Sequence, residues 1–127
     1  TGASISSLVI PEAVTELGMA CLAGTGITTL KLPSAITSIP EYCFAFNISI
    51  RALEIPEGVT DIGSMAFDGV YIEELILPTT LTRIEQSGIY SNNLVVKFRG
   101  TEAQGQAIYG GFYMVNGEII VEFNYEG

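Results

Sequence analysis

The chain has 127 residues, of which 48% are hydrophobic, and this is enough apolar side chain for one domain with its own core. It carries 14 acidic residues against 5 basic ones, a net charge of −9. Binding to nucleic acid or to an anionic membrane surface requires clustered lysine and arginine, so the composition disfavours both as partners. No run of about 18 apolar residues occurs, so we expect no membrane span in this chain.

The chain contains no histidine and only two cysteines, Cys21 and Cys43. Without histidine, no Ser-His-Asp or Cys-His arrangement can form within the chain. Two thiols alone are too few for a zinc site. We therefore predict no metal, no cofactor and no catalytic residue.

Four prolines set the register of an internal repeat, and they are 22, 23 and 22 residues apart: Pro11, Pro33, Pro56 and Pro78. Apolar residues stand one, three and six positions before each proline. Three positions after it comes a valine, isoleucine or leucine, followed by a column of threonines: Thr15, Thr37, Thr60 and Thr82. The repeats span about residues 5–26, 27–49, 50–71 and 72–93.

This pattern predicts a solenoid. The alternating segment before each proline favours a short strand, and the proline ends it because it has no amide hydrogen to donate. A single coil of this length cannot bury its apolar residues, whereas stacked coils bury them against one another. We expect a parallel sheet with strands ~4.8 Å apart. The threonine hydroxyls should bond neighbouring coils, which is a structural role.

After the fourth repeat the pattern changes. Residues 94–99 alternate as a final strand, so we assign residues 1–100 to the solenoid. Thr101 and Gln104 predict the capping box of a short helix that ends at Gly110-Gly111. The segment 112–123, FYMVNGEIIVEF, predicts a β-hairpin around Asn116-Gly117.

Residues 101–127 would then cap the last coil of a single structural domain. No matching cap precedes Ile5, so we expect either further repeats or a removed leader upstream.

The repeat pattern L-x-[IL]-P-x-x-[VIL]-T-x-I-x-x-x-A-F resembles the BspA-like class of bacterial leucine-rich repeats. Repeat three, LEIPEGVTDIGSMAF, carries it most fully, whereas Leu22 and Gly88-Ile89 depart from it in repeats one and four. The resemblance implies a leucine-rich-repeat solenoid of the right-handed α/β superhelix class, rich in β-structure with little helix. It also implies a bacterial cell-surface or secreted protein that contacts other proteins.

The two cysteines occupy the same column in successive repeats. Stacked coils would place their Cα atoms about 5 Å apart, but side chains in register point in parallel, whereas a disulfide needs Cβ atoms about 3.8 Å apart. Ala66 and Gly88 hold this position in the later repeats, so the column requires small buried residues. We predict buried thiols without a disulfide.

The variable positions of the strands should form the surface of the sheet, in two outward columns: Ser7, Thr29, Ala52, Glu74 and Val9, Lys31, Glu54, Ile76. These columns hold no aromatic side chain. Lys31 with Glu54, and Arg51 with Glu73, should form cross-strand pairs. Together with their neighbours they make up the candidate binding face, which is Thr29, Lys31, Arg51, Glu54, Glu73, Glu74 and Ile76.

Three functions are compatible with these residues. The first is a non-catalytic protein-binding or adhesion module whose partner is a protein, such as a host or matrix protein. The second is a structural spacer of a longer surface protein, without its own ligand. The third is an enzyme that uses carboxylates such as Glu54, Glu73 and Glu74, but ion pairing between strands explains these residues more simply.

Overall fold

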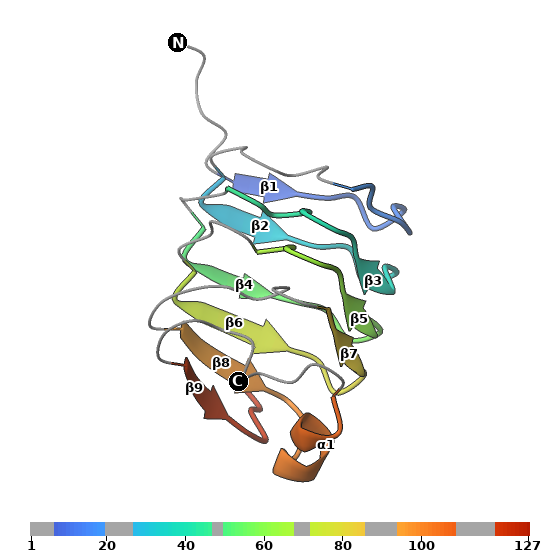
Figure 1. The fold of residues 1–127 in the computed structure, drawn as a ribbon. Coiled ribbons are helices and arrows are strands. Elements are labelled where there is room, and N and C mark those ends of the chain that lie inside the picture. Colours follow the sequence, from blue (N-terminus) through green and yellow to red (C-terminus); the bar gives the residue numbers. More distant parts are fainter. Residues whose placement is uncertain (1–6, 20–26, 47–49, 68–71, 86–93, 109–118) are drawn as a thin grey trace.

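The computed structural model describes residues 7–19, 27–46, 50–67, 72–85, 94–108 and 119–127. Figure 1 shows the coils stacked one upon another, with the longer strands along one side and the shorter strands along another. The longer strands are β1 (Ser7–Val9), β2 (Thr29–Lys31), β4 (Ala52–Glu54), β6 (Glu74–Leu77), β8 (Leu94–Phe98) and β9 (Ile119–Glu122). The shorter strands are β3 (Ser38–Ile39), β5 (Asp61–Ile62) and β7 (Arg83–Ile84).

The strand pairing confirms the register that the prolines predict. Every pair is parallel: β1 with β2, β4 with β6, β6 with β8, and β8 with β9 along the long-strand side, and β3 with β5 and β7 in the second sheet. Ser7 lies opposite Thr29, and Glu54 lies opposite Ile76, as the alignment requires. The predicted leucine-rich solenoid with little helix is therefore confirmed.

The repeated apolar columns form one continuous core. Phe44 and Phe67, in successive repeats, are fully buried with their ring centroids 5.1 Å apart. Phe98 on β8 lies opposite Leu77, in a different buried column, and meets Phe123 edge to face at 6.3 Å. Repeat one contributes less to the core, because several of its apolar residues are only partly buried: Leu8, Val14 and Leu17.

The threonine column holds the second sheet together. The Thr60 amide and hydroxyl both donate to the Thr37 carbonyl, at 2.8 and 3.2 Å. Thr82 repeats this arrangement on the Thr60 carbonyl, at 2.8 and 3.0 Å. The predicted structural role of these threonines is confirmed, whereas the second sheet itself was not predicted.

One glycine of the second sheet permits a close approach between coils. The Gly63 amide donates to the Ile39 carbonyl at 2.7 Å. A β-carbon added at Gly63 would lie 2.7 Å from the Glu41 nitrogen and 2.8 Å from the Pro40 carbonyl carbon. Backbone atoms cannot move aside as a flexible side chain can, so this position requires glycine.

A glutamate after the proline links successive coils in two places. The Glu12 carboxylate accepts hydrogen bonds from the Ser34 amide and hydroxyl at 2.8 and 2.7 Å. The Glu57 carboxylate accepts from the Thr79 amide and hydroxyl at 3.0 and 2.8 Å. Repeats one and two are therefore joined in the same way as repeats three and four.

The start of the cap agrees with its prediction. Helix α1 (Glu102–Gln106) begins at the N-cap Thr101, whose side chain accepts from the Gln104 amide while the Gln104 side chain accepts from the Thr101 amide. Strand β9 then pairs in parallel with β8 and so continues the sheet of the solenoid.

Two sequence predictions lie wholly or partly outside the described residues. The predicted hairpin at 112–123 involves the range 109–118. The predicted helix end at Gly110-Gly111 is wrong, because α1 ends at Gln106 with Ala107 as its C-cap. Cys43 is fully buried, but Cys21 lies outside the described residues, so the prediction about the thiols is untested. Among the helices of the described part, none is long and apolar enough to cross a membrane.

Candidate binding surface

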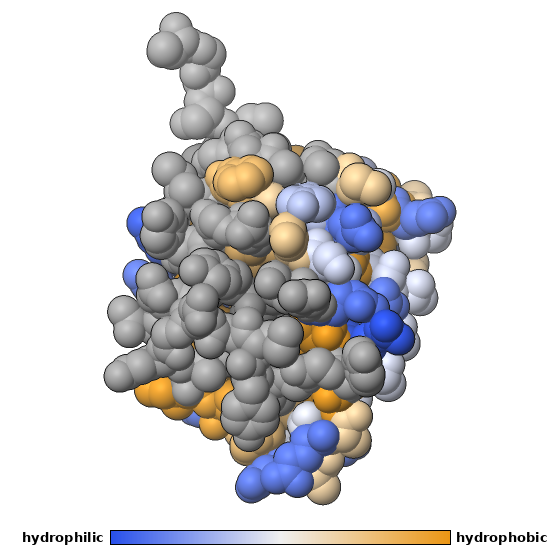
Figure 2. Space-filling view, viewed as in Figure 1, coloured by the Kyte–Doolittle hydropathy of each residue, from blue (hydrophilic) through white to orange (hydrophobic). Residues whose placement is uncertain are grey.

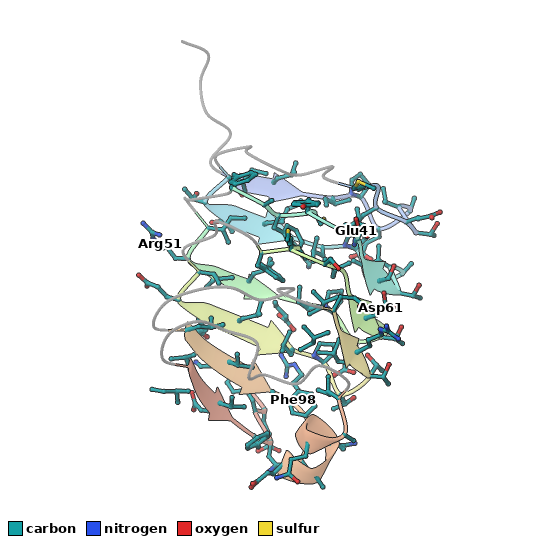
Figure 3. The ribbon with its side chains drawn as sticks, viewed as in Figure 1. Glu41, Arg51, Asp61 and Phe98 are labelled. Carbon is teal, nitrogen blue, oxygen red and sulfur yellow. The ribbon has the colours of Figure 1, made fainter. Side chains whose placement is uncertain are left out.

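The seven candidate residues all lie along the long-strand side of the stack. We call the outward surface of β1, β2, β4, β6, β8 and β9, with the residues that directly flank these strands, the long-strand face. The more exposed candidates are Thr29, Lys31, Arg51, Glu54 and Glu73, and the half-buried ones are Glu74 and Ile76. Figure 3 shows Arg51 projecting outward just before β4, far from Glu41 and Asp61 beside the second sheet.

Two ion pairs on this face were not predicted. The Glu54 carboxylate pairs with Arg99 at 3.0 Å, and Glu74 pairs with Lys97 at 2.9 Å. The predicted pairing of Glu54 with Lys31 is wrong, because Glu54 instead receives the long side chain of Arg99 from across β6. Aligning the repeats shows which residues are neighbours on adjacent strands. It does not show that a long arginine side chain can span an intervening strand.

The C-terminal residues add an aromatic ring to the face. Tyr125 is held by its amide, which donates to the Phe98 carbonyl at 3.0 Å. Its ring lies 5.1 Å from the Lys97 ammonium and 5.3 Å from the Arg99 guanidinium, within the range of cation–π attraction. Tyr125 therefore joins the two ion pairs in one cluster.

Lys97, Arg99 and Tyr125 also belong to this face, although the sequence did not predict them there. Lys97 had a usable signal, since the alternation of residues 94–99 places it in the column of Ile76, and the structure pairs these two positions. Tyr125 lies beyond the last strand and had no such signal.

The electrostatics of the cluster favour its charged form. The hydrogen bond to the Glu74 carboxylate raises the pKa of Lys97 above its ordinary value, against a smaller opposing effect of desolvation. Lys97 and Arg99 are each matched by a carboxylate. They are consequently less available to a partner than Lys31.

Two depressions lie on the long-strand face. One, with a volume of about 540 Å³, is lined by Glu12, Leu30, Lys31, Leu32, Ser34, Glu54 and Pro56. The other, of about 350 Å³, is lined by Arg51, Ala52, Glu73, Glu74, Val95, Lys97 and Glu122. Five of the seven candidate residues therefore line a depression, and each depression contains both signs of charge.

Positive charge is concentrated on this side of an acidic protein. Four of the five basic residues of the sequence belong to the long-strand face: Lys31, Arg51, Lys97 and Arg99. The fifth, Arg83 on β7, pairs with Glu85 beside the second sheet. Figure 2 shows hydrophilic residues gathered over the margin formed by β3, β5 and β7. The two sides of the solenoid thus differ in the balance of their charges.

The described residues contain no group of three or more potential metal ligands. Two carboxylates of the long-strand face, Glu54 and Glu74, instead pair with basic side chains.

Comparison with protein families identifies the family of this repeat. The model of the BspA type leucine-rich repeat region matches residues 1–95 in six copies. The chain belongs to the BspA-type leucine-rich repeat family. A comparison with curated proteins found no match.

Two solved structures resemble this BspA-type chain. A leucine-rich cell surface protein from Faecalibacterium prausnitzii A2-165 is 30% identical, with a TM-score of 0.75 over 82% of this chain and 28% of its own. The pneumococcal vaccine antigen PcpA is 13% identical, with a TM-score of 0.53 over 92% of this chain and 41% of its own, and this similarity concerns the fold. The chain therefore spans less than half the length of either protein. The predicted cell-surface or secreted location agrees with the first of them.

Proposed function

We propose that this chain is a non-catalytic protein-binding module of a bacterial surface protein, and that it binds through the long-strand face. The observation that carries the proposal is the distribution of charge. An acidic chain concentrates four of its five basic residues on one face, beside two depressions of mixed charge. Charged groups arranged in this way give specificity and faster association with a partner of complementary charge.

Lys31 and Arg51 are the residues most suited to contact a partner. Both side chains are exposed, and each lines one of the two depressions. Their exposure and their place in the two depressions carry this choice. We therefore expect the partner to present acidic side chains towards Lys31 and Arg51.

A matched pair of variants tests this proposal. Lys31→Gln with Arg51→Gln removes two positive charges from the long-strand face, and Arg83→Glu changes the net charge equally beside the second sheet. With a protein captured by the wild-type domain, the first variant should weaken binding at least about tenfold, since each charge-assisted contact contributes roughly 1.5 kcal/mol or more. Arg83→Glu should leave the affinity unchanged.

Equal affinities for all three proteins would contradict the proposed face. A domain that captures no protein would instead favour the second candidate, a spacer within a longer surface protein. The similarity to only 28% and 41% of two longer proteins is the observation that supports this alternative.

A further inference from the structure

The two depressions are more acidic than the long-strand face around them. Glu12 and Glu54 line the larger depression together with a single basic residue, Lys31. The smaller one is lined by three carboxylates and two basic side chains, which are Glu73, Glu74, Glu122, Arg51 and Lys97. Carboxylates therefore outnumber basic groups by one in each depression, although basic residues are concentrated on this face.

Lys31 is the basic group of the larger depression. It is exposed on β2, and its ammonium forms no ion pair with any residue that the structure describes. The hydrogen bonds from Ser34 lower the pKa of Glu12, and the charge of Lys31 lowers it further, so these two charged groups interact. A carboxylate from a partner can pair with Lys31, but it does so in the presence of Glu12.

Both carboxylates of the larger depression keep one oxygen for a ligand. The Ser34 amide and hydroxyl donate to Oε2 of Glu12 at 2.8 and 2.7 Å. Arg99 donates to Oε2 of Glu54 at 3.0 Å. No described residue donates to Oε1 of either glutamate, whereas Glu57, outside the depression, uses both of its oxygens in bonds to the next repeat. Glu12 and Glu54 can each accept a hydrogen bond from a partner.

The charges of the depression act against a partner that is only acidic. A carboxylate beside Lys31 is attracted by the ammonium and repelled by the two glutamates, and Coulomb energy falls only with the inverse of distance. Arg99 offsets the charge of Glu54, but Glu12 is bonded only by the neutral donors of Ser34. Like charges brought together across an interface oppose binding. A partner that also brings cations satisfies the whole depression.

We infer that the larger depression recognises a protein segment of mixed charge, in which one acidic side chain is flanked on both sides by basic side chains. The acidic side chain pairs with Lys31, and the basic ones donate to Oε1 of Glu12 and of Glu54. The volume of about 540 Å³ falls within the range of small-ligand sites and admits the side chains of a short segment. The inference rests on the proposed function and specifies the chemistry of its protein partner.

Short peptides test the inference directly. The probes are acetylated and amidated peptides of sequence Gly-Lys-Asp-Lys-Gly, Gly-Gln-Asp-Gln-Gly and Gly-Lys-Asn-Lys-Gly, in about 0.15 M salt to screen long-range attraction. Titrations followed by the NMR amide shifts of Lys31 and Ser34 should give the first peptide a dissociation constant at least about threefold below the others, the effect of two exposed ion pairs. Equal affinity of the first peptide and either of the others would overturn the inference.

Variants of the depression assign the contacts. Lys31→Gln should abolish the preference for the aspartate peptide over the asparagine peptide. Glu12→Gln with Glu54→Gln should abolish the preference for flanking lysines over glutamines. Glu16→Gln with Glu41→Gln removes the same charge from exposed residues that line neither depression, and it should leave both preferences unchanged. Preferences that persist in folded variants of the depression would overturn the assigned contacts.

The result can be separated from the test of the proposed function. If Lys31→Gln with Arg51→Gln weakens capture of the partner while the three peptides bind alike, the face binds as proposed and the mixed-charge recognition is overturned. If the mixed peptide binds best while those substitutions leave capture unchanged, the mixed-charge recognition is supported and the proposed face for the captured protein is contradicted.

Discussion

The second sheet and the long-strand face arise from the same four repeats, but their residues vary to different degrees. In the second sheet, threonine recurs at the same position and makes the same bonds, as Thr60 and Thr82 show. On the long-strand face the equivalent positions differ from one repeat to the next, as with Lys31, Glu54 and Ile76. Positions that are the same in each repeat stack the coils, and positions that differ give the face its chemistry.

The largest expected effect concerns the shared core between the two sheets. Phe67→Ala should lower the free energy of unfolding by about 3–5 kcal/mol, because the ring is fully buried against Phe44. Phe46→Ala is the control, since that ring is 61% exposed and its replacement should cost less than about 1 kcal/mol. Urea denaturation measures the free energy of unfolding of both variants. Similar losses for the two variants would contradict the assigned core.

A smaller effect is expected where the second sheet requires glycine. Gly63→Ala should cost about 1–3 kcal/mol, because the added β-carbon meets the backbone at Pro40 and Glu41. Gly18 is the matched control, as it aligns with Gly63 and an added β-carbon there meets nothing within 4 Å. Urea denaturation of both variants gives the difference, and a tolerated alanine at position 63 would show that the coils are not so close.

The threonine column allows a direct comparison between the two sides. Thr82→Val removes the hydroxyl that donates to the Thr60 carbonyl and should cost about 0.5 kcal/mol, since the bond is exposed to solvent. Thr29→Val makes the same chemical change on the long-strand face, where an exposed β-branched residue is expected to be neutral. Equal effects in thermal unfolding would remove the distinction between repeated and variable positions.

The smallest effect depends on pH. The hydrogen bonds from the Ser34 amide and hydroxyl lower the pKa of Glu12 in the folded chain. A carboxyl with a lowered folded pKa stabilises the protein above its unfolded pKa, about 4.3, and this contribution is lost as the pH falls through the folded pKa. Glu12→Gln should therefore lower the Tm at pH 7 and have a smaller effect near pH 3. Glu16→Gln controls for charge, and an effect of Glu12→Gln that does not depend on pH would contradict this assignment.

Much of the fold was predictable because four repeats contain the same information. Alignment on the prolines gave the strand register, the buried columns and the role of the threonines. The second sheet was harder to predict from the sequence, because strands of two residues, such as β3 and β5, are too short to show a recognisable alternation.

The candidate surface was predicted in position but not in its contacts. Five of the seven candidate residues lie on the strands, where alternation fixes which face a residue occupies. The other two, Arg51 and Glu73, directly precede β4 and β6. The ion pairs were not predictable, since Arg99 reaches Glu54 across an intervening strand. Tyr125 follows the last strand, where no repeat constrains its place.

The central claim is that one side of this solenoid binds while the other side holds the coils together. The most direct measurement compares partner affinity and unfolding free energy for Lys31→Gln with Arg51→Gln and for Thr60→Val with Thr82→Val. The first pair should weaken binding without changing stability, and the second should reduce stability without changing the affinity of the folded domain. The claim would be contradicted if each pair of substitutions altered both quantities alike.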